Sequence, residues 1–124
     1  MWIEKNENPL NQRVGDCVIR AISTALGQDW VKTYADLCVE AFIECDLMSS
    51  NYIWGKYLSR KGYRRHTIPN DCRCYTVEDF CKDHPKGTYI LGTGTHALTV
   101  IDGNHFDSWD SGQETPIYYF KKEG

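Results

Sequence analysis

The spacing of apolar residues changes once along the chain, from helical spacing before Gly87 to short alternating runs after it. The first part predicts a strand over 63–68 and four helices, over 16–26, 29–45, 49–62 and 76–84. The second part predicts an antiparallel meander with strands within 88–92, 96–102, 104–110 and 116–122. Helices followed by strands indicate an α+β domain whose C-terminal antiparallel sheet packs on the N-terminal helix.

The length and composition indicate one soluble domain that spans residues 1–124. The net charge of −3 and the lack of a long Lys/Arg-rich run argue against nucleic-acid binding, which depends on clustered positive charge. No apolar window is long enough to span a membrane, and the first residues lack the apolar core of a secretion signal. We therefore expect a cytoplasmic protein with no membrane or nucleic-acid partner.

The chain contains six cysteines, which we expect to be free thiols or metal ligands in a reducing compartment. Cys17 has a special position, because it follows Gly15 and Asp16 in the first turn of the first predicted helix, with Asp16 as a suitable N-cap. Exposed backbone N–H groups and the helix dipole favour a thiolate there. The same N–H groups can receive an oxyanion, so Cys17 is a candidate nucleophile.

His96 is the candidate base for Cys17. It follows the glycine-rich turn over 92–95 and stands at the head of an apolar strand, where an imidazole can reach both a nucleophile and a substrate. His105 is a weaker alternative because it lies nearer to the next turn.

Three separated motifs occur in the order glutamine, cysteine, histidine and acid. They are Gln-Arg-Val-Gly-Asp-Cys with the helix that follows it, Thr-His-Ala-Leu around His96, and Phe-Asp-Ser-Trp around Asp107. This order resembles the papain-like cysteine peptidases, which include papain, the C39-type peptidases and the Josephin deubiquitinases. The nucleophile helix is also similar to that of ovarian-tumour-type deubiquitinases, with Ile19 in place of their phenylalanine, and Ser108 replaces the proline of the C39-type motif.

The resemblance implies a papain-like fold and gives Gln12 the role of an oxyanion donor. It also implies an acid behind the imidazole, for which Asp107 and Asp110 compete. A two-residue turn between the strand that begins at His96 and the strand that contains Asp107 puts Asp107 on the face of His96. A three-residue turn over 102–104 puts Asp110 opposite His96. Asp107 is the preferred prediction because it matches the motif.

We therefore expect a thiol hydrolase that cleaves a peptide, isopeptide or related amide bond through Cys17, His96 and Asp107, without a cofactor; transfer to an amine would use the same residues. The resemblance suggests a peptide or protein substrate with a ubiquitin-like or double-glycine tail, and a bacterial or phage origin. Tyr52, Trp54 and the loop over 92–95 are candidates to line its cleft, although packing is the preferred role of the two aromatic residues.

The alternative is a non-catalytic interaction protein, either papain-like or stabilised by zinc. Five residues could supply tetrahedral zinc ligands: His66, Cys72, Cys74, Cys81 and His84. Only one residue separates Cys72 from Cys74, whereas two usually separate paired zinc thiolates. Ordinary thiols, with no metal site, are therefore the preferred prediction.

Overall fold

A computed structural model describes residues 1–12, 14–69 and 75–123. It is an α+β domain, as the sequence predicts, with four helices and one six-stranded sheet among these residues. The helices are α1 (Cys17–Leu26), α2 (Trp30–Glu44), α3 (Asn51–Arg60) and α4 (Val77–Asp83). The strands are β1 (Trp2–Glu4), β2 (Tyr63–Thr67), β3 (Thr88–Gly92), β4 (Ala97–Ile101), β5 (Asn104–Asp107) and β6 (Tyr118–Lys122).

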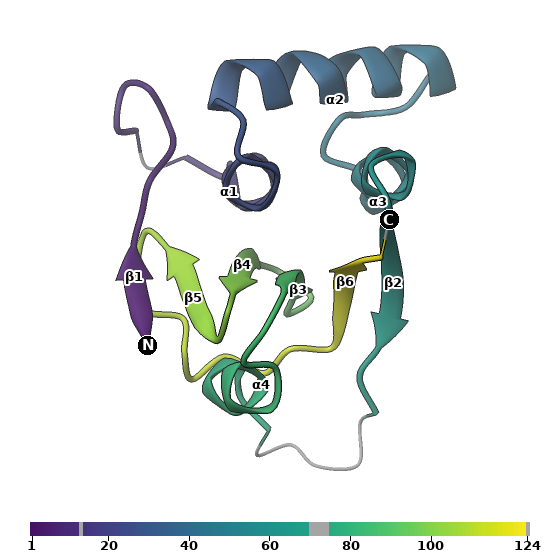
Figure 1. Ribbon diagram of the computed structural model, residues 1–124. Coiled ribbons are helices and arrows are strands. Elements are labelled where there is room, and N and C mark those ends of the chain that lie inside the picture. The colour runs from purple at the N-terminus through teal and green to yellow at the C-terminus, as the bar shows by residue number, and fades with distance from the viewer. Residues whose placement is uncertain (13, 70–74, 124) are drawn as a thin grey trace.

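The helices cover both faces of the sheet. Helices α1 and α3 lie on one face with α2 outside them, and α4 lies on the other face (Figure 1). On the α1 side the core contains Ile22, Trp54, Ile90 and Phe120, whereas Val77, Phe80, Leu98 and Val100 are buried on the α4 side. The sheet therefore has apolar side chains on both faces, and α1 packs directly on one of them.

Local signals account for most of the helix ends. The Asp29 side chain accepts a hydrogen bond from the Lys32 backbone N–H, and Thr76 forms a capping box with Asp79. Gly27 ends α1 in the left-handed conformation, with a φ of 64°. The predicted bounds of α1, α2 and α4 are confirmed to within about two residues, which is the usual uncertainty of helix ends.

The sheet is a simple meander only in part. Strands β3, β4 and β5 follow one another as antiparallel neighbours, but β6 pairs with the other edge of β3 and β2 pairs with β6, giving the order β1-β5-β4-β3-β6-β2. The predicted meander over 88–122 is wrong at β6, which lies beside β3 and not beside β5, and the predicted antiparallel sheet is wrong at β1, which pairs in parallel with β5. Three residues are too few to show an alternating pattern, so nothing in the local sequence identified this strand.

The β4–β5 turn has two residues, Asp102 and Gly103, both with positive φ, at 49° and 81°. Such a turn matches the natural twist of a hairpin. The pairing of Ile101 with Asn104 and of Val100 with His105 fixes the register. The two-residue turn predicted from the sequence is thus confirmed, and it decides which aspartate faces His96.

Among the residues that the structure describes, no helix is both long and apolar enough to cross a membrane.

Candidate active site

The two candidate reacting residues come from elements that pack directly on each other. Cys17 is the first residue of α1, and His96 immediately precedes β4, whose Thr99 hydroxyl donates a hydrogen bond to the Ala21 carbonyl of α1. The Cys17 thiol is half-buried, and it lies close enough to the His96 side chain and to the backbone of Ala97 for both to lower its pKa. Packing of the first helix on the sheet therefore brings together two residues that are far apart in the sequence.

The other side of the imidazole faces Asp107, at the end of β5. Its Nε2 lies 2.5 Å from the carboxylate Oδ2, and the His96 and Asp107 side chains are 12% and 1% exposed. Because Nε2 is used by Asp107, Nδ1 is the ring nitrogen left for the Cys17 thiol. The imidazole is thus hydrogen-bonded to the carboxylate and lies close to the thiol.

The pKa values of all three groups are shifted, and each shift favours the charged form. Burial would raise the pKa of the Cys17 thiol, but its hydrogen bonds with His96 and the Ala97 backbone outweigh burial and lower it. Burial would lower the pKa of His96, yet hydrogen bonds with Asp107 and Cys17 raise it to about 9. Burial opposes ionisation of Asp107 too, and its bonds with His96 and Ser111 nevertheless lower its pKa. These shifts favour a thiolate–imidazolium pair beside a carboxylate.

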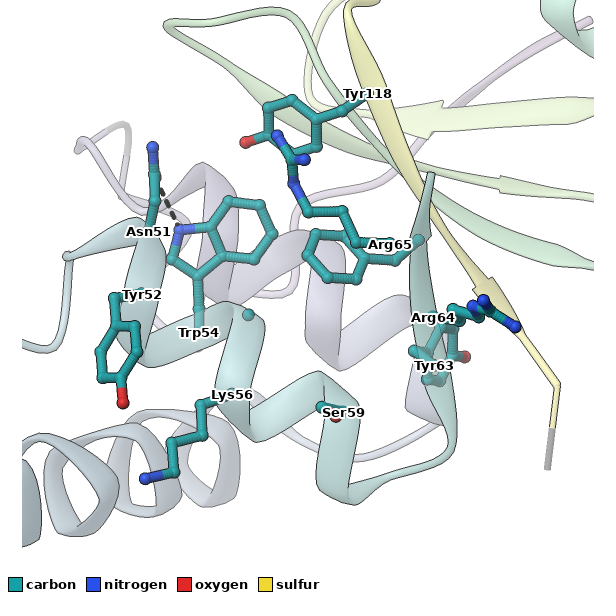
Figure 2. Close-up of a pocket in the computed structure, with 11 residues that line it drawn as sticks. Asn51, Tyr52, Trp54, Lys56, Ser59, Tyr63, Arg64, Arg65 and Tyr118 are labelled. Atoms are coloured by element: carbon teal, nitrogen blue, oxygen red, sulfur yellow. Dashed lines mark hydrogen bonds between the residues drawn. The ribbon is translucent and has the colours of Figure 1, made fainter. Parts of the chain in front are cut away.

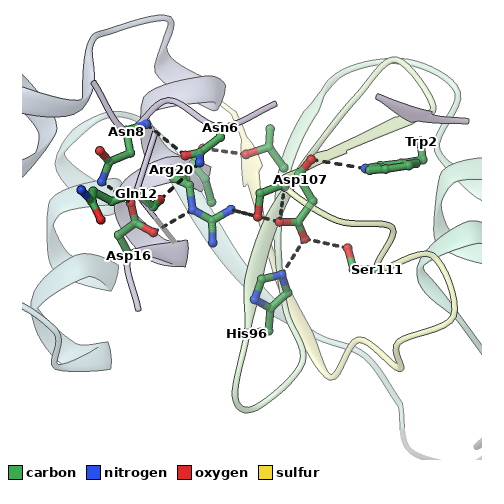
Figure 3. A network of polar contacts seen from close by, with 12 residues as sticks. Trp2, Asn6, Asn8, Gln12, Asp16, Arg20, His96, Asp107 and Ser111 are labelled. Carbon is green, nitrogen blue, oxygen red and sulfur yellow. Dashed lines mark hydrogen bonds and ion pairs between the residues drawn. The ribbon is translucent and has the colours of Figure 1, made fainter. Parts of the chain in front are cut away.

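Asp107 is held by hydrogen bonds to both of its carboxylate oxygens (Figure 3). Besides His96, the Ser111 hydroxyl donates to Oδ2 at 2.7 Å. The Ser108 backbone N–H and the Arg20 guanidinium donate to Oδ1 at 2.8 and 3.1 Å. With this many donors, the carboxylate is fixed in orientation and stays ionised.

The start of α1 differs from the expectation in one respect. Asp16 occupies the N-cap position, but its side chain makes no capping hydrogen bond. It accepts instead from Arg20 at 2.9 Å, from the Trp30 indole at 3.0 Å and from Asn8 at 3.3 Å. The N–H groups of the first helical turn, including that of Cys17, are therefore left without a side-chain cap and can donate to an oxyanion.

Gln12 is exposed, in the loop before α1. Its backbone carbonyl accepts a hydrogen bond from Asn6 at 3.3 Å. Its side-chain amide makes no hydrogen bond with the rest of the described chain, and Figure 3 shows it on the Asp16 side of the network, away from His96. The oxyanion role that the resemblance gave to Gln12 stays a prediction.

Asp110 and His105 form a separate pair. His105 is fully buried; its Nε2 lies 3.0 Å from Asp110 Oδ1, and its Nδ1 lies 4.0 Å from the Cys81 sulfur. Asp110 as the partner of His96, which a three-residue turn would require, is therefore wrong, because the turn has two residues. His105 as the base for Cys17 is also wrong, because its buried ring lies on the α4 side of the sheet beside Cys81.

Trp109 covers the imidazole from outside. Its ring centre lies 5.1 Å from that of His96, and the residue is 43% exposed. The partly exposed indole thus lies beside the imidazole and not in the core. An indole here limits the access of water to the bond between His96 and Asp107.

The predicted zinc ligands are only partly described, because Cys72 and Cys74 lie outside the described residues. His66 stacks on Tyr119, His84 stacks on Phe80, and Cys81 lies beside His105. Within residues 1–12, 14–69 and 75–123, no group of three potential ligands converges. The described residues therefore give no support to a zinc centre.

Two residues of this network were not identified from the sequence. Arg20 connects Asp16 to Asp107, and Ser111 supports Asp107 from the loop after β5. Arg20 does leave a signal, because it is a charged residue flanked by Ile19 and Ala21 in a helix with a buried face. Ser111 leaves none, since a serine after a strand is most often an ordinary loop residue.

Comparison of the chain with family models, with curated proteins and with solved structures found no match. The function therefore has to be inferred from the chemistry of the site itself.

Proposed function

We propose that this protein is a papain-like thiol hydrolase that cleaves a peptide, isopeptide or related amide bond. The observation that carries the proposal is the His96–Asp107 pair, in which Nε2 of the imidazole lies 2.5 Å from the acid, with the Cys17 thiol close to the same imidazole. A helix-start cysteine against a histidine from the sheet is also the arrangement that the resemblance to papain-like peptidases implies. No cofactor is needed for this chemistry.

In the first step, the Cys17 thiolate attacks the substrate carbonyl carbon and forms a carbon–sulfur bond. The oxygen becomes an oxyanion, which accepts hydrogen bonds from the uncapped N–H groups at the start of α1. The carbon–nitrogen bond then breaks as the His96 imidazolium gives its proton to the leaving amine. The product of this step is a thioester on Cys17.

In the second step, a water molecule attacks the thioester and gives a proton to the neutral His96. The carbon–sulfur bond breaks, the carboxylic acid product leaves, and the thiolate–imidazolium pair is restored. Asp107 keeps the ring in one orientation and stabilises its positive charge throughout. An amine in place of water would make the same site an acyltransferase.

The experiment that tests the proposal is alkylation with iodoacetamide at about pH 6, followed by mass spectrometry of each cysteine. At this pH an ordinary thiol, with a pKa near 8.5, is almost fully protonated and reacts slowly. We expect Cys17 to react faster than Cys45, although Cys45 is exposed and Cys17 is half-buried. The His96→Ala variant should lose this advantage, because it removes the imidazolium that lowers the pKa of Cys17.

The second measurement is the hydrolysis of a fluorogenic peptide amide, with Cys17→Ala as the inactive control. Labelling of Cys17 no faster than that of Cys45, together with no hydrolysis by the wild type above that of Cys17→Ala, would rule the proposal out. The alternative of a non-catalytic interaction protein would then be the better reading of the chain.

A further inference from the structure

A groove of about 610 Å³ lies between α3 and the strands β2 and β6, on the α1 side of the sheet. Trp54, Gly55 and Lys56 line it from the helix, and Arg65, Tyr118 and Phe120 line it from the strands (Figure 2). The space at Cys17 on the side of Arg20 and Phe106 is much smaller, about 10 Å³. Two larger spaces lie near Cys17: one of about 320 Å³ lined by Gly15, Asp16 and Val18, and this groove, which is the larger of the two.

The sheet register connects the groove to the candidate nucleophile. Ala97, whose backbone contacts the Cys17 thiol, pairs with Gly92 of β3, and Gly92 pairs with Tyr118 of β6. A Cβ atom on Gly92 would lie only 2.2 Å from Cζ of Tyr118. The Tyr118 ring thus leans over the bare glycine toward Ala97, and it forms the wall of the groove nearest to Cys17.

The floor of the groove is apolar and aromatic. Trp54 and Phe120 are 2% and 4% exposed, and their ring centres lie 5.3 Å apart. Gly55 lies in the interior of α3, where alanine would stabilise the helix, and a Cβ atom there would be 3.6 Å from the Phe120 ring. The glycine is therefore not required by the backbone, and its effect is to leave room above Phe120.

The charged residues that line the groove are all basic. Lys56 forms an ion pair with Glu44, and Arg64 lies 4.0 Å from Glu123. The exposed Arg65 guanidinium stacks over the Tyr118 ring at 4.5 Å, and no carboxylate of the described residues lies within 4 Å of it. A planar cation in this position is suited to a carboxylate of a bound molecule.

We propose that this groove binds an extended segment of the substrate in which a large apolar side chain is followed or preceded by an acidic one. The apolar side chain occupies the space above Phe120 and Gly55, and the acidic side chain pairs with Arg65. The inference rests on the proposed hydrolase function for its link to Cys17, but the binding of such a segment can be measured without catalysis.

The distance to Cys17 sets the position of the segment relative to the cleaved bond. Two strand spacings separate Ala97 from Tyr118, which amounts to about 10 Å. An extended peptide advances about 3.3 Å per residue, so the apolar side chain lies about three residues from the cleaved bond. A probe with two glycines between this side chain and the reporter fits that distance.

The test uses three coumarin amides that differ at single positions: acetyl-Asp-Phe-Gly-Gly-aminomethylcoumarin, its Asn-Phe analogue and its Asp-Ala analogue. We expect kcat/KM to fall about fivefold from the Asp-Phe to the Asn-Phe probe, because an exposed ion pair contributes little. It should fall at least tenfold, by rough estimate, from Asp-Phe to Asp-Ala, because an aromatic side chain loses its burial.

Two variants assign these preferences to the groove. Arg65→Gln should reduce the ratio of the Asp-Phe and Asn-Phe rates to about one, since the cation has gone. Gly55→Ala should reduce the ratio of the Asp-Phe and Asp-Ala rates, while the melting temperature stays the same or rises, because alanine favours the helix. A loss of the preference without a loss of stability is not expected of a residue with a purely structural role.

Binding separates a failure of this inference from a failure of the proposed function. If no probe is hydrolysed, anisotropy with fluorescein-labelled Asp-Phe-Gly-Gly amide and the Cys17→Ala protein still tests the groove, and affinity should fall in Arg65→Gln. Equal rates and equal affinities for the three sequences would overturn the inference. Binding of a short single-stranded oligothymidylate that is lost in Arg65→Gln would also overturn it, by assigning the groove to nucleic acid.

Discussion

Arg20 holds Asp107 in place from α1: its Nη1 lies 3.1 Å from Asp107 Oδ1, and the two side chains are 11% and 1% exposed. Its Nε lies 2.9 Å from Asp16. The residue before Cys17 and the carboxylate behind His96 therefore share one guanidinium. Any movement of α1 along the sheet would break this connection, so the alignment of thiol and imidazole is coupled to Arg20.

The Arg20→Met variant should be destabilised by about 3–5 kcal/mol, because it leaves the buried Asp16 carboxylate without its counter-charge and removes one of the two cations beside the buried Asp107. The free energy of unfolding in urea measures the effect. Lys32→Met is the matched control, since Lys32 pairs with Asp36 on the surface of α2 and its loss should cost less than about 1 kcal/mol. An Arg20 effect as small as the control would contradict a structural role for the shared guanidinium.

Replacement of the two aspartates should separate their roles. Asp107→Asn removes the charge that stabilises the His96 imidazolium, and we expect kcat/KM to fall by roughly a hundredfold or more. Asp110→Asn, which alters only the partner of His105, should leave kcat/KM within about twofold, a limit set by general experience with surface substitutions. Iodoacetamide labelling of Cys17 should follow the same order, and equal effects of the two replacements would contradict the assignment.

The rate should have a bell-shaped dependence on pH. The ascending limb reports the Cys17 thiol and should lie below the pKa of about 8.5 of an ordinary thiol, because the pKa of Cys17 is lowered. The descending limb reports loss of the His96 proton, which the leaving amine needs, and should lie at about 9. A profile of kcat/KM on the Asp-Phe probe measures both limbs, and a descending limb near 6.5 would mean that the pKa of His96 is not raised.

Stability should depend on pH differently in the wild type and in Cys17→Ala. In the wild type, folding transfers a proton from the thiol to the imidazole, so few protons are bound or released between pH 6.5 and about 9. In Cys17→Ala, the Asp107 carboxylate still raises the pKa of His96 above its unfolded value of 6.5. The stabilisation from this imidazolium is complete below pH 6.5 and is lost as the pH rises through the folded pKa.

Urea midpoints at about pH 6 and about pH 9.5, on either side of the window that linkage defines, measure this difference. We expect the midpoint of Cys17→Ala to fall more than that of the wild type. The same fall in both proteins would show that the thiol and the imidazole do not exchange a proton on folding.

Gly92→Ala should disturb the wall of the groove. Its Cβ atom would lie 2.2 Å from the Tyr118 ring, so the ring has to move, at a cost of about 1–3 kcal/mol. In a Tyr118→Ala background the same replacement should cost almost nothing, because the clash is absent. A double-mutant cycle from urea unfolding gives the coupling energy, and additive effects would show that Tyr118 does not occupy the space over Gly92.

Much of this architecture can be predicted because its signals are local. Asp29, Gly27 and Thr76 mark helix ends by their own chemistry, and the Asp102-Gly103 pair specifies a two-residue turn. That turn fixes the register, and the register brings Asp107 rather than Asp110 to His96. That Asp107 faces His96 thus follows from the four neighbouring residues 101–104.

The features that could not be predicted depend on contacts between distant segments. Strand β1 exists because Trp2 and Ile3 pair with β5, and the position of β6 beside β3 depends on which edge of the sheet was free. The side chain of Asp16 was expected to cap α1, but Arg20 and Trp30 offered it stronger partners. Competition of this kind is decided by the folded structure and has no local pattern.

The second cysteine–histidine–aspartate set, Cys81, His105 and Asp110, gives the molecule an internal reference. It has the same residue types as the first set and, like His96, His105 uses Nε2 for its aspartate. Burial raises the pKa of Cys81, in the middle of α4, whereas that of Cys17, at the start of α1, is lowered. A search for these three residue types alone would therefore return two sets in this chain. The two sulfurs differ in their place along the helix and in exposure, because Cys17 is half-buried and Cys81 is buried.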